Sequence, residues 1–300
     1  MIIVFGSNVL DLFFQQPDLP PKDKALFLDG HVEQPGGKGA NQAIAAARAG
    51  ATVRFYGALG EGGHGRQMYK NLAQNGVDIS GVEFLDMPSG LATIFVDESD
   101  GTHRIVVSQG ANLKARQETI PDDQLNNQTI LLVQGELPIA ETAKLIKRTK
   151  QAGGKTVMNF APATQPLSEE LLNDLDIIIL NEYEAEALGN QHDLEITDKK
   201  KLAFNLSKRF SMITIITIGP EGSIVADQND IINIPALDIE AVDTVGAGDA
   251  FSGYLCAALD RGEPLESAVR EASVAGSITC TKIGAQTSLP DKAEVQKLLN

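Results

Sequence analysis

Short apolar runs alternate along this chain with longer stretches in which apolar residues recur every three or four positions. The runs are nearly continuous, without regular polar positions, which is typical of strands that are buried on both faces of a sheet. They lie at residues 2–5, 53–59, 129–135, 156–160, 177–180 and 213–218.

The stretches between these runs have helical periodicity. Strand–helix–strand order with short connections predicts a parallel sheet with helices on both faces, a three-layer α/β/α fold. Because no repeat, low-complexity tract or linker interrupts the chain, we expect residues 1–300 to form a single domain. The helices are expected at 39–49, 64–75, 140–152, 199–209, 248–260 and 266–281.

Two segments break this pattern. Residues 12–35 hold four prolines and no helical period, and residues 91–107 alternate like a hairpin with Ser99, Asp100 and Gly101 as its turn. We expect both to form strands outside the main sheet, in a small β-layer over one edge of it. Ligands of α/β sheets bind at the carboxyl ends of the strands, so such a layer is predicted to act as a lid.

Composition narrows the function classes. The net charge of −15 argues against a nucleic-acid or anionic membrane partner, because both require a basic face. Cys256 and Cys280 lie in apolar helical stretches, which predicts buried free thiols rather than a disulfide, and no metal-ligand spacing occurs. The N-terminus does not resemble a signal peptide and no apolar run reaches the roughly 18 residues of a spanning helix, so a cytoplasmic location is expected.

A first glycine-rich stretch, PGGKGANQAIAAARAG, covers residues 35–50 and leads from a loop into a helix. Glycines allow backbone N–H groups to approach a ligand closely, and Lys38 adds a positive charge. The spacing of a Walker A loop is absent. The alternative is that these glycines serve only the packing of the helix.

A second stretch, DTVGAGDAF, covers residues 243–251. The backbone N–H groups of Gly246, Ala247 and Gly248 precede a helix and can form an anion cradle, to which the helix dipole adds. Asp249 at the helix start has a structural alternative, since aspartate is a favoured helix cap.

A third stretch, NEYEAEAL, follows the buried run at 177–180. Asn181 and Glu184 lie one helical turn apart, on the same face, and could together hold a hydrated Mg²⁺. Here too the alternative is a helix cap with acidic residues in the first turn.

Taken together, these stretches resemble the ribokinase family, also called the PfkB family of sugar kinases, in order and over nearly the whole chain. The GGKGAN and DTVGAGD pair carries most of the specificity. The matching segments are GSNVLD (6–11), PGGKGANQA (35–43), QGELP (134–138), NFAPA (159–163), NEYEAE (181–186), TIGPEG (217–222), VDTVGAGDAF (242–251) and KIGAQTSLP (282–290).

The resemblance implies transfer of the γ-phosphoryl group of ATP to a sugar hydroxymethyl oxygen, the 5-hydroxyl of ribose. Asp249 is then the general base, and the amides of Gly246, Ala247 and Gly248 are the anion hole. In phosphoryl transfer a protein mainly positions groups and balances charge, so base and cradle belong side by side.

The resemblance also assigns the remaining contacts. It places the sugar on Asp11, Gly37, Lys38, Asn41, Glu136 and Asp249. It places the nucleotide with its Mg²⁺ on Asn181, Glu184, Thr217, Gly219, Gly222, Gly248 and Ser273. It implies a site for a monovalent cation such as K⁺ formed by Asp243, Val245, Thr279, Lys282, Gly284 and Ser288.

One position departs from the family pattern. Ribokinases carry Asn two residues before the first Asp, and this chain has Val9 there, with Asn8 one position earlier. A shift of one residue at a strand end points the side chain the other way, so Asn8 is not expected to replace it. The hypothesis is that the enzyme tolerates or prefers a sugar that lacks the matching hydroxyl, such as 2-deoxyribose.

Other functions stay open at this point. Within the enzyme class the alternative is a deoxyribokinase or another sugar or nucleoside kinase of the family; from another class it is a non-catalytic sugar-binding module. An oxidoreductase is disfavoured because no GxGxxG follows the first strand. Apolar residues alternate along the lid segments, and an isolated ribbon is marginally stable, so we expect a homodimer through the lid.

Overall fold

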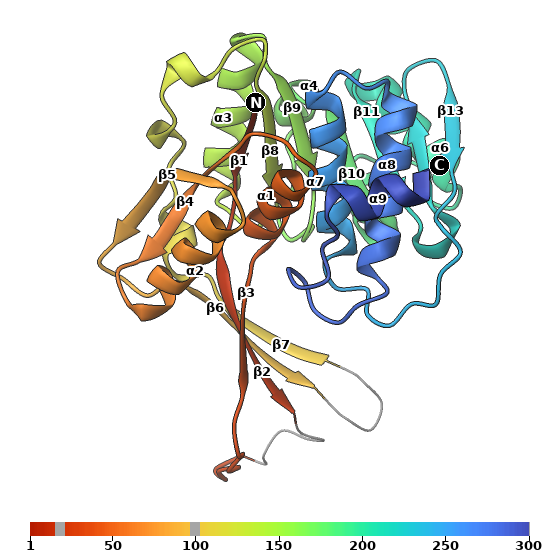
Figure 1. Ribbon diagram of the computed structural model, residues 1–300. Helices are drawn as coiled ribbons and strands as arrows, with labels where there is room; N and C mark the ends of the chain where they lie inside the picture. The colour runs from red at the N-terminus through yellow and green to blue at the C-terminus, as the bar shows by residue number, and fades with distance from the viewer. Residues whose placement is uncertain (16–21, 97–102, 300) are drawn as a thin grey trace.

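The computed structural model describes residues 1–15, 22–96 and 103–299, arranged as a helix-covered body from which a small sheet projects (Figure 1). The strands are β1 (Ile2–Phe5), β2 (Val9–Gln15), β3 (Val32–Gly36), β4 (Val53–Gly60), β5 (Asp78–Leu85), β6 (Gly90–Val96), β7 (His103–Ser108), β8 (Ile130–Gln134), β9 (Lys155–Asn159), β10 (Ile177–Asn181), β11 (Ile213–Thr217), β12 (Ser223–Ala226) and β13 (Ile231–Ile234). The helices are α1 (Lys38–Arg48), α2 (Gly63–Gln74), α3 (Ile139–Gln151), α4 (Glu169–Asn173), α5 (Glu182–Gln191), α6 (Lys199–Phe210), α7 (Ala247–Asp260), α8 (Leu265–Thr279) and α9 (Lys292–Leu299).

The main sheet has nine strands in the order β13-β12-β11-β10-β9-β8-β1-β4-β5. Pairing is parallel from β5 to β11, and only β12 and β13 are antiparallel. The parallel strands connect through helices, as parallel strands require. Their carboxyl ends therefore meet at one edge of the body.

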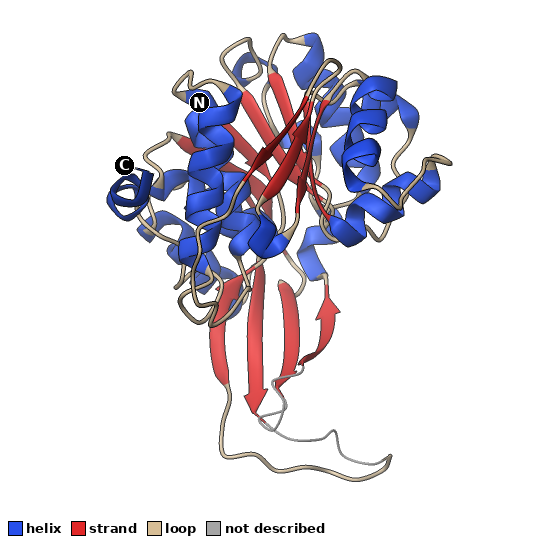
Figure 2. Ribbon diagram, turned by 90° about the vertical axis from the view of Figure 1, so that its right-hand side faces the viewer, coloured by secondary structure: helices blue, strands red, loops and turns tan. Residues whose placement is uncertain are grey.

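Helices cover both faces of this sheet (Figure 2). Strand β1 illustrates why: Ile2 and Val4 belong to one buried apolar cluster, with α1, α7 and α8, whereas Ile3 and Phe5 belong to a second cluster, with α3, α5 and α6. A strand buried on both faces needs apolar residues at every position, and the continuous runs of the sequence satisfy this. The predicted three-layer α/β/α class is confirmed.

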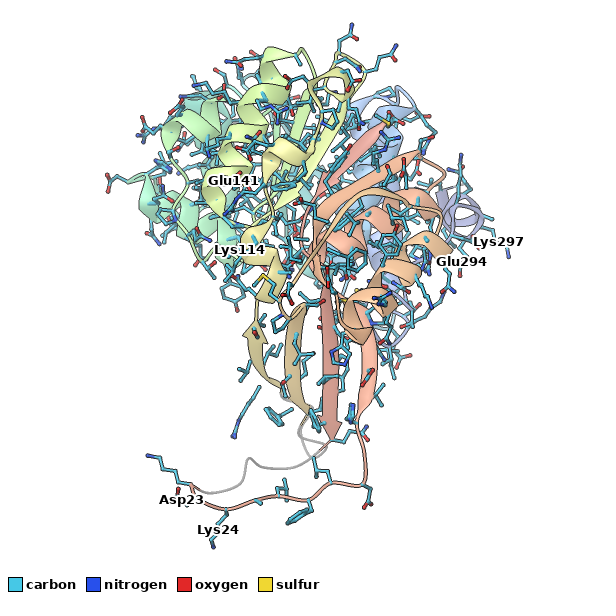
Figure 3. The ribbon with its side chains drawn as sticks, turned by 90° about the vertical axis from the view of Figure 1, so that its left-hand side faces the viewer. Asp23, Lys24, Lys114, Glu141, Glu294 and Lys297 are labelled. Atoms are coloured by element: carbon cyan, nitrogen blue, oxygen red, sulfur yellow. The ribbon has the colours of Figure 1, made fainter. Side chains whose placement is uncertain are left out.

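The second sheet has four strands in the order β3-β2-β6-β7 and projects from the body, with the segment around Asp23 and Lys24 at its far end (Figure 3). On one face, Leu10 of β2 packs with Leu59 and Met68 of the body. On the other face, Val9, Ala92 and Ile94 form a small apolar cluster of their own.

The sequence located this sheet but not its bounds. Its strands begin at residue 9 and end at residue 108, whereas residues 22–31 of the predicted segment 12–35 form no strand. Asp23 lies in the left-handed region with φ of 61°, which interrupts an extended chain. The predicted turn at 99–101 lies outside the described residues.

Among the described residues, no helix has the length and apolar character needed to cross a membrane. Both cysteines are free, as expected, but only Cys256 is buried; Cys280 is partly exposed. The prediction of two buried thiols is therefore wrong for Cys280, because it lies at the end of α8, where the helix borders a cavity.

Candidate active site

Helices α1 and α7 lie against each other at the carboxyl edge of the main sheet, and their first turns carry the two glycine-rich motifs. Gly253 allows this close packing. A Cβ at Gly253 would lie 2.6 Å from the carbonyl oxygen of Gln42 and 2.7 Å from the amide nitrogen of Ala46. The glycine thus brings the first turn of α7, with Asp249, next to the first turn of α1.

Asp249 is buried, with 6% of its surface exposed, and two side-chain amides of α1 hold its carboxylate. Asn41 donates from Nδ2 to Oδ2 at 2.9 Å, and Gln42 donates from Nε2 to Oδ1 at 2.9 Å. Asp249 makes no side-chain cap of its own helix, so the cap alternative is wrong. Each carboxylate oxygen keeps a second lone pair that can accept a proton.

The backbone around Asp249 supports the predicted anion cradle in part. Gly246 has φ of 82°, and a Cβ there would lie 3.1 Å from the backbone of Ala285, so only glycine fits. Within the described chain, the N–H groups of Gly248 and Asp249 donate to no acceptor, whereas the N–H of Ala247 donates to the carbonyl of Thr244 at 3.3 Å. The free donors at this helix start are therefore those of Gly248 and Asp249.

Two further carboxylates, Glu136 and Asp11, lie beside the start of α1. Glu136 follows β8 and accepts hydrogen bonds from the hydroxyl of Ser7 and from the backbone N–H of Lys38, the latter at 2.9 Å. Asp11 projects from β2 over the Cα of Gly36, where a Cβ would lie 2.2 Å from Oδ2. Burial, and next the negative charge of Glu136, raise the pKa of Asp11 to about 7.

Lys38 provides the positive charge among these acids. Burial by itself lowers the pKa of Lys38, but the charges of Asp249, Glu136 and Glu184 outweigh it, and the pKa is raised. In the described structure the Lys38 ammonium forms no ion pair within 4.0 Å and donates no side-chain hydrogen bond. It is a partly exposed cation whose donors remain available to a ligand.

Asn181 and Glu184 form a capping box at the start of α5. The side chain of Asn181 accepts from the N–H of Glu184 at 2.9 Å, and Glu184 accepts from the N–H of Asn181 at 2.8 Å. The structural alternative for these residues is therefore present. It leaves one oxygen of Glu184 unused, and burial raises the pKa of Glu184, with the charge of Asp249 adding to this while Asn181 and Lys38 act against it. Glu184 thus caps a helix and also faces the acidic and basic groups of the site.

A cavity of about 410 Å³ adjoins the start of α7. Five residues assigned to the nucleotide line it: Thr217, Gly219, Gly222, Gly248 and Ser273. Ala247 lines it as well, so the cavity reaches the residues next to Asp249. Its remaining wall is mainly apolar, with Leu237, Ile239 and Phe251, as is usual for a small-molecule site.

The residues assigned to a monovalent cation lie on the loop before α7 and on the loop after α8, which Asp243 joins, except Thr279, the last residue of α8. Its carboxylate accepts from the N–H of Val245 at 3.0 Å and from the N–H of Gly284 at 2.8 Å. The carbonyls of Val245, Lys282 and Gly284 accept no hydrogen bond within the described residues. Oxygen ligands of this kind suit hard cations, so these loops fit the group that the resemblance implies.

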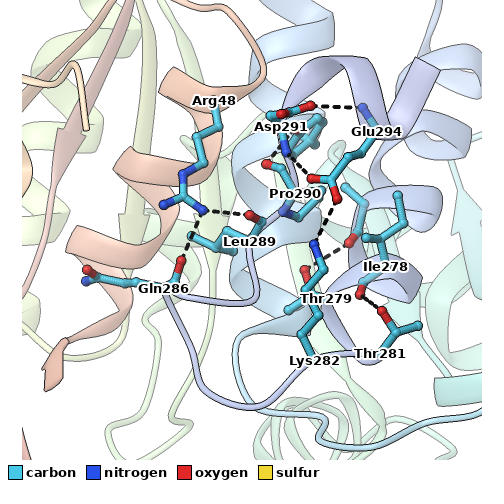
Figure 4. Close-up of polar contacts among 12 residues, drawn as sticks. Arg48, Ile278, Thr279, Thr281, Lys282, Gln286, Leu289, Pro290, Asp291 and Glu294 are labelled. Carbon is cyan, nitrogen blue, oxygen red and sulfur yellow. Dashed lines mark hydrogen bonds and ion pairs between the residues drawn. The ribbon is translucent and has the colours of Figure 1, made fainter. Parts of the chain in front are cut away.

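Arg48 of α1 binds the loop between α8 and α9. Its guanidinium donates to the backbone carbonyls of Gln286 at 3.1 Å and Leu289 at 2.6 Å (Figure 4). Thr279 and Ser288, also assigned to the cation, donate their hydroxyls to the carbonyls of Ala275 and Ala285. The loop that follows α8 is therefore held on α1, the helix that contacts Asp249.

The side chain of Val9 lies on the face of β2 that also carries Asp11. Val9 is buried at 7% exposure in the apolar cluster with Ala92 and Ile94. Asn8 lies elsewhere: its backbone pairs with the side chain of Asn112, and its own amide has no hydrogen-bond partner among the described residues. Asn8 thus does not take the place of Val9 on that strand face.

Sequence reasoning missed a set of glutamines. Gln42 accepts from Gln134 at 2.8 Å and donates to Asn159 at 3.0 Å as well as to Asp249. Gln286 donates to Asn41 at 2.9 Å. Gln42 lies within a quoted motif, but no local pattern links it to residues more than 90 positions away.

Comparison with known proteins gives a consistent result. The family model described as "pfkB family carbohydrate kinase" matches residues 1–292. A ribokinase of Haemophilus influenzae is 35% identical over 99% of this chain and 98% of its own length. A ribokinase of Bacillus subtilis is 33% identical over 100% of this chain and 99% of its own length.

Solved structures agree with the sequence relatives. A ribokinase structure from Thermotoga maritima has a TM-score of 0.92 at 31% identity, covering 99% of this chain and 98% of that one. The structure of an Arabidopsis thaliana ribokinase complexed with ribose and ATP has a TM-score of 0.91 at 29% identity, covering 100% of this chain and 98% of that one.

Proposed function

Since this chain belongs to the pfkB family of carbohydrate kinases, we propose that it phosphorylates ribose on the 5-hydroxyl at the expense of ATP, with Asp249 as the general base. The observation that carries the proposal is the position of Asp249. Ala247 and Gly248, which directly precede it, line the cavity of about 410 Å³. Its carboxylate is held by Asn41 and Gln42 of α1, the helix whose first residue, Lys38, is bonded to Glu136. A general base for this reaction must contact the sugar hydroxyl and also lie next to the phosphates of the nucleotide.

The chemistry follows from the groups present. Asp249 accepts the proton of the sugar hydroxyl while that oxygen attacks the γ-phosphorus, and the bond from phosphorus to the bridging oxygen of ADP breaks. The amides of Gly248 and Asp249 stabilise the charge on the transferring group, with Gly246 shaping the turn. Lys38, which has donors to spare near three carboxylates, adds positive charge.

The assignment of the cavity to the nucleotide rests on its size and wall. Thr217, Gly219, Gly222 and Ser273 leave space beside an apolar surface that suits a purine. The sugar is assigned to the carboxylates of Asp11 and Glu136, with Gly37 and Asn41, because carboxylates and amides can take two hydroxyl groups in one plane. Gly37 has φ of 91°, and a Cβ there would lie 2.8 Å from the backbone nitrogen of Val9, so only glycine fits at this position.

The inorganic cofactors are part of the proposal. Glu184 and Asn181 would hold Mg²⁺ through water, since carboxylate and amide oxygens are the ligands that Mg²⁺ prefers. When bound, Mg²⁺ neutralises charge on the phosphates. K⁺ is assigned to Asp243 and to the carbonyls of Val245, Thr279, Lys282 and Gly284 with the hydroxyl of Ser288, and it would stiffen the loops beside Gly246.

The second candidate substrate is 2-deoxyribose, and Val9 favours it. The Val9 side chain is apolar, buried and on the same strand face as Asp11, so a hydroxyl placed against it has no partner there. Leaving one hydroxyl without a partner costs about 1–3 kcal/mol.

The proposed assembly is a homodimer through the second sheet. Ile105 and Val107 are 58% and 54% exposed, and they pair with Ile94 and Ala92 across β6, so their side chains extend the apolar cluster of Val9. A second copy of this sheet would cover that face.

The test of substrate identity is ADP formation with ribose, 2-deoxyribose, fructose and adenosine in the presence of Mg²⁺ and K⁺, with the phosphorylated carbon assigned by NMR. We expect turnover with ribose and a 5-phosphate product. Val9→Asn should raise the ratio of kcat/KM for ribose to that for deoxyribose by about tenfold. An unchanged ratio would show that Val9 does not select the sugar, and turnover only with fructose or adenosine would contradict the ribose assignment.

A further inference from the structure

Gln286 belongs to the loop between α8 and α9 that also holds Lys282, Gly284 and Ser288. Its side chain is buried, with 8% of the residue exposed, and it points away from its own loop to α1 and α2. It donates from Nε2 to Oδ1 of Asn41 at 2.9 Å, and it accepts at Oε1 from Nδ2 of Asn71 at 2.6 Å.

These contacts form a directed chain. Asn71 donates to Gln286, Gln286 donates to Asn41, and Asn41 donates to Oδ2 of Asp249. A side-chain amide has a donor end and an acceptor end, so the orientation of each amide determines that of the next. With Gln286 present, the NH₂ group of Asn41 must face the carboxylate of Asp249.

Without Gln286 this orientation is lost. Asn41 could turn by half a rotation and present its carbonyl oxygen to Asp249, where two oxygens would repel each other. A buried carboxylate that loses a hydrogen-bond donor is stabilised less in its ionised form. The other oxygen would still be held by Gln42, so the fold of the site would survive.

The loop itself is fixed independently of this amide. Arg48 donates to the backbone carbonyls of Gln286 and Leu289, so the position of the loop does not depend on the Gln286 side chain (Figure 4). The Gln286 side chain is therefore not needed to hold the loop, and its bond to Asn41 can orient that amide.

We propose that Gln286 is a positioning residue for the proposed general base: it connects the loop after α8 to Asp249 by fixing the orientation of Asn41. The inference rests on the proposed role of Asp249 and adds that this loop sets the orientation and basicity of the carboxylate. The chain from Asn71 to Asp249 runs across α2, the loop, α1 and α7.

The test compares kcat, KM and the pH dependence of kcat in the wild type and in Gln286→Leu, at saturating sugar, ATP, Mg²⁺ and K⁺. Gln286→Leu keeps the side-chain bulk and removes the donor. We expect kcat to fall about tenfold, with KM for ATP changed less than about threefold, and the acidic limb of the kcat profile to move to higher pH.

A second variant guards against loss of folding. Asn71→Leu removes the donor at the far end of this hydrogen-bond chain and leaves Gln286 in place. It should shift the acidic limb of the kcat profile in the same direction by a smaller amount. The matched control is Thr287→Val, the next residue of the loop, whose hydroxyl bonds within the described residues only to the carbonyl of Ile283. It should reproduce the wild-type profile.

Two failures can be told apart. A wild type without sugar-dependent turnover, or an Asp249→Asn variant with full activity, would overturn the proposed function. An active wild type and an inactive Asp249→Asn, together with folded Gln286→Leu and Asn71→Leu variants that keep the wild-type kcat and acidic limb, would overturn the positioning role alone.

Discussion

Gly253→Ala tests how closely α1 and α7 must pack to place the base. The added Cβ would lie 2.6 Å from the carbonyl oxygen of Gln42, a backbone atom that cannot rotate away. Ordinary contact begins near 3.4 Å, so the helices must separate by about 0.8 Å at this point. Gly253 is one helical turn from Asp249, so the same displacement reaches the carboxylate.

The magnitude follows from this displacement. Separation by about 0.8 Å would lengthen the 2.9 Å bonds from Asn41 and Gln42 to Asp249 to about 3.7 Å, beyond hydrogen-bonding distance. A misplacement of about 1 Å at a reacting group costs roughly 100-fold in rate. Overpacking costs about 1–3 kcal/mol and the better helix propensity of alanine returns about 1 kcal/mol, so the net loss of stability is about 0–2 kcal/mol.

The assay is steady-state ADP formation, together with thermal unfolding. Gly253→Ala should lose about 100-fold in kcat while Tm falls by only a few degrees. The matched control is Gly63→Ala in the first turn of α2, where an added Cβ meets no atom within 4 Å; its kcat should be unchanged. A Gly253→Ala enzyme with kcat within threefold of the wild type would refute the packing argument.

Three further changes test other parts of the site. Burial and the charge of Glu136 raise the pKa of Asp11 to about 7, so the folded state favours the neutral form of this carboxyl group. The free energy of unfolding of the wild type should therefore fall relative to that of Asp11→Asn as the pH rises from about 4 to about 7. Urea titrations that show a constant difference between the two proteins over this range would contradict this. Asp243→Asn weakens the acceptor for two backbone N–H groups and removes the charge from the proposed cation site, so half-maximal activity should need about tenfold more K⁺; an unchanged K⁺ titration would exclude the site. Ile105→Glu puts a charge on the exposed apolar face of the second sheet and should convert a dimer to a monomer in sedimentation experiments, whereas a dimer that persists would place the interface elsewhere.

The parts of the fold that the sequence predicted are those with a strong local pattern. The six continuous apolar runs became β1, β4, β8, β9, β10 and β11, because strands buried on both faces cannot contain regular polar positions. Strands β5, β12 and β13 were not predicted. Strands β5 and β13 form the two edges of the sheet, and their mixed burial leaves no continuous apolar run. Strand β12 lies next to β13 and is fully buried, but it has only four residues, and one of them is Ser223.

The candidate site shows the same division. Asp249, Lys38 and Glu184 were found because each stands in a dense local motif. The glutamines Gln42 and Gln286 were missed, because their partners are far away in the sequence; Gln286 reaches Asn41 across 245 positions of the chain. The NxxE motif shows a further limit: Asn181 and Glu184 do form a capping box, so the local pattern by itself could not separate a cap from a ligand site.

In the proposed reaction, Asp249 takes the proton from the sugar hydroxyl. The most direct test is the initial rate of ADP formation with ribose and saturating ATP, for the wild type and for Asp249→Asn, which keeps the size of the side chain and removes its basicity. We expect ribose-dependent turnover that falls about 10²- to 10⁴-fold in Asp249→Asn, with the binding of ATP retained. Equal rates in the two proteins would contradict it.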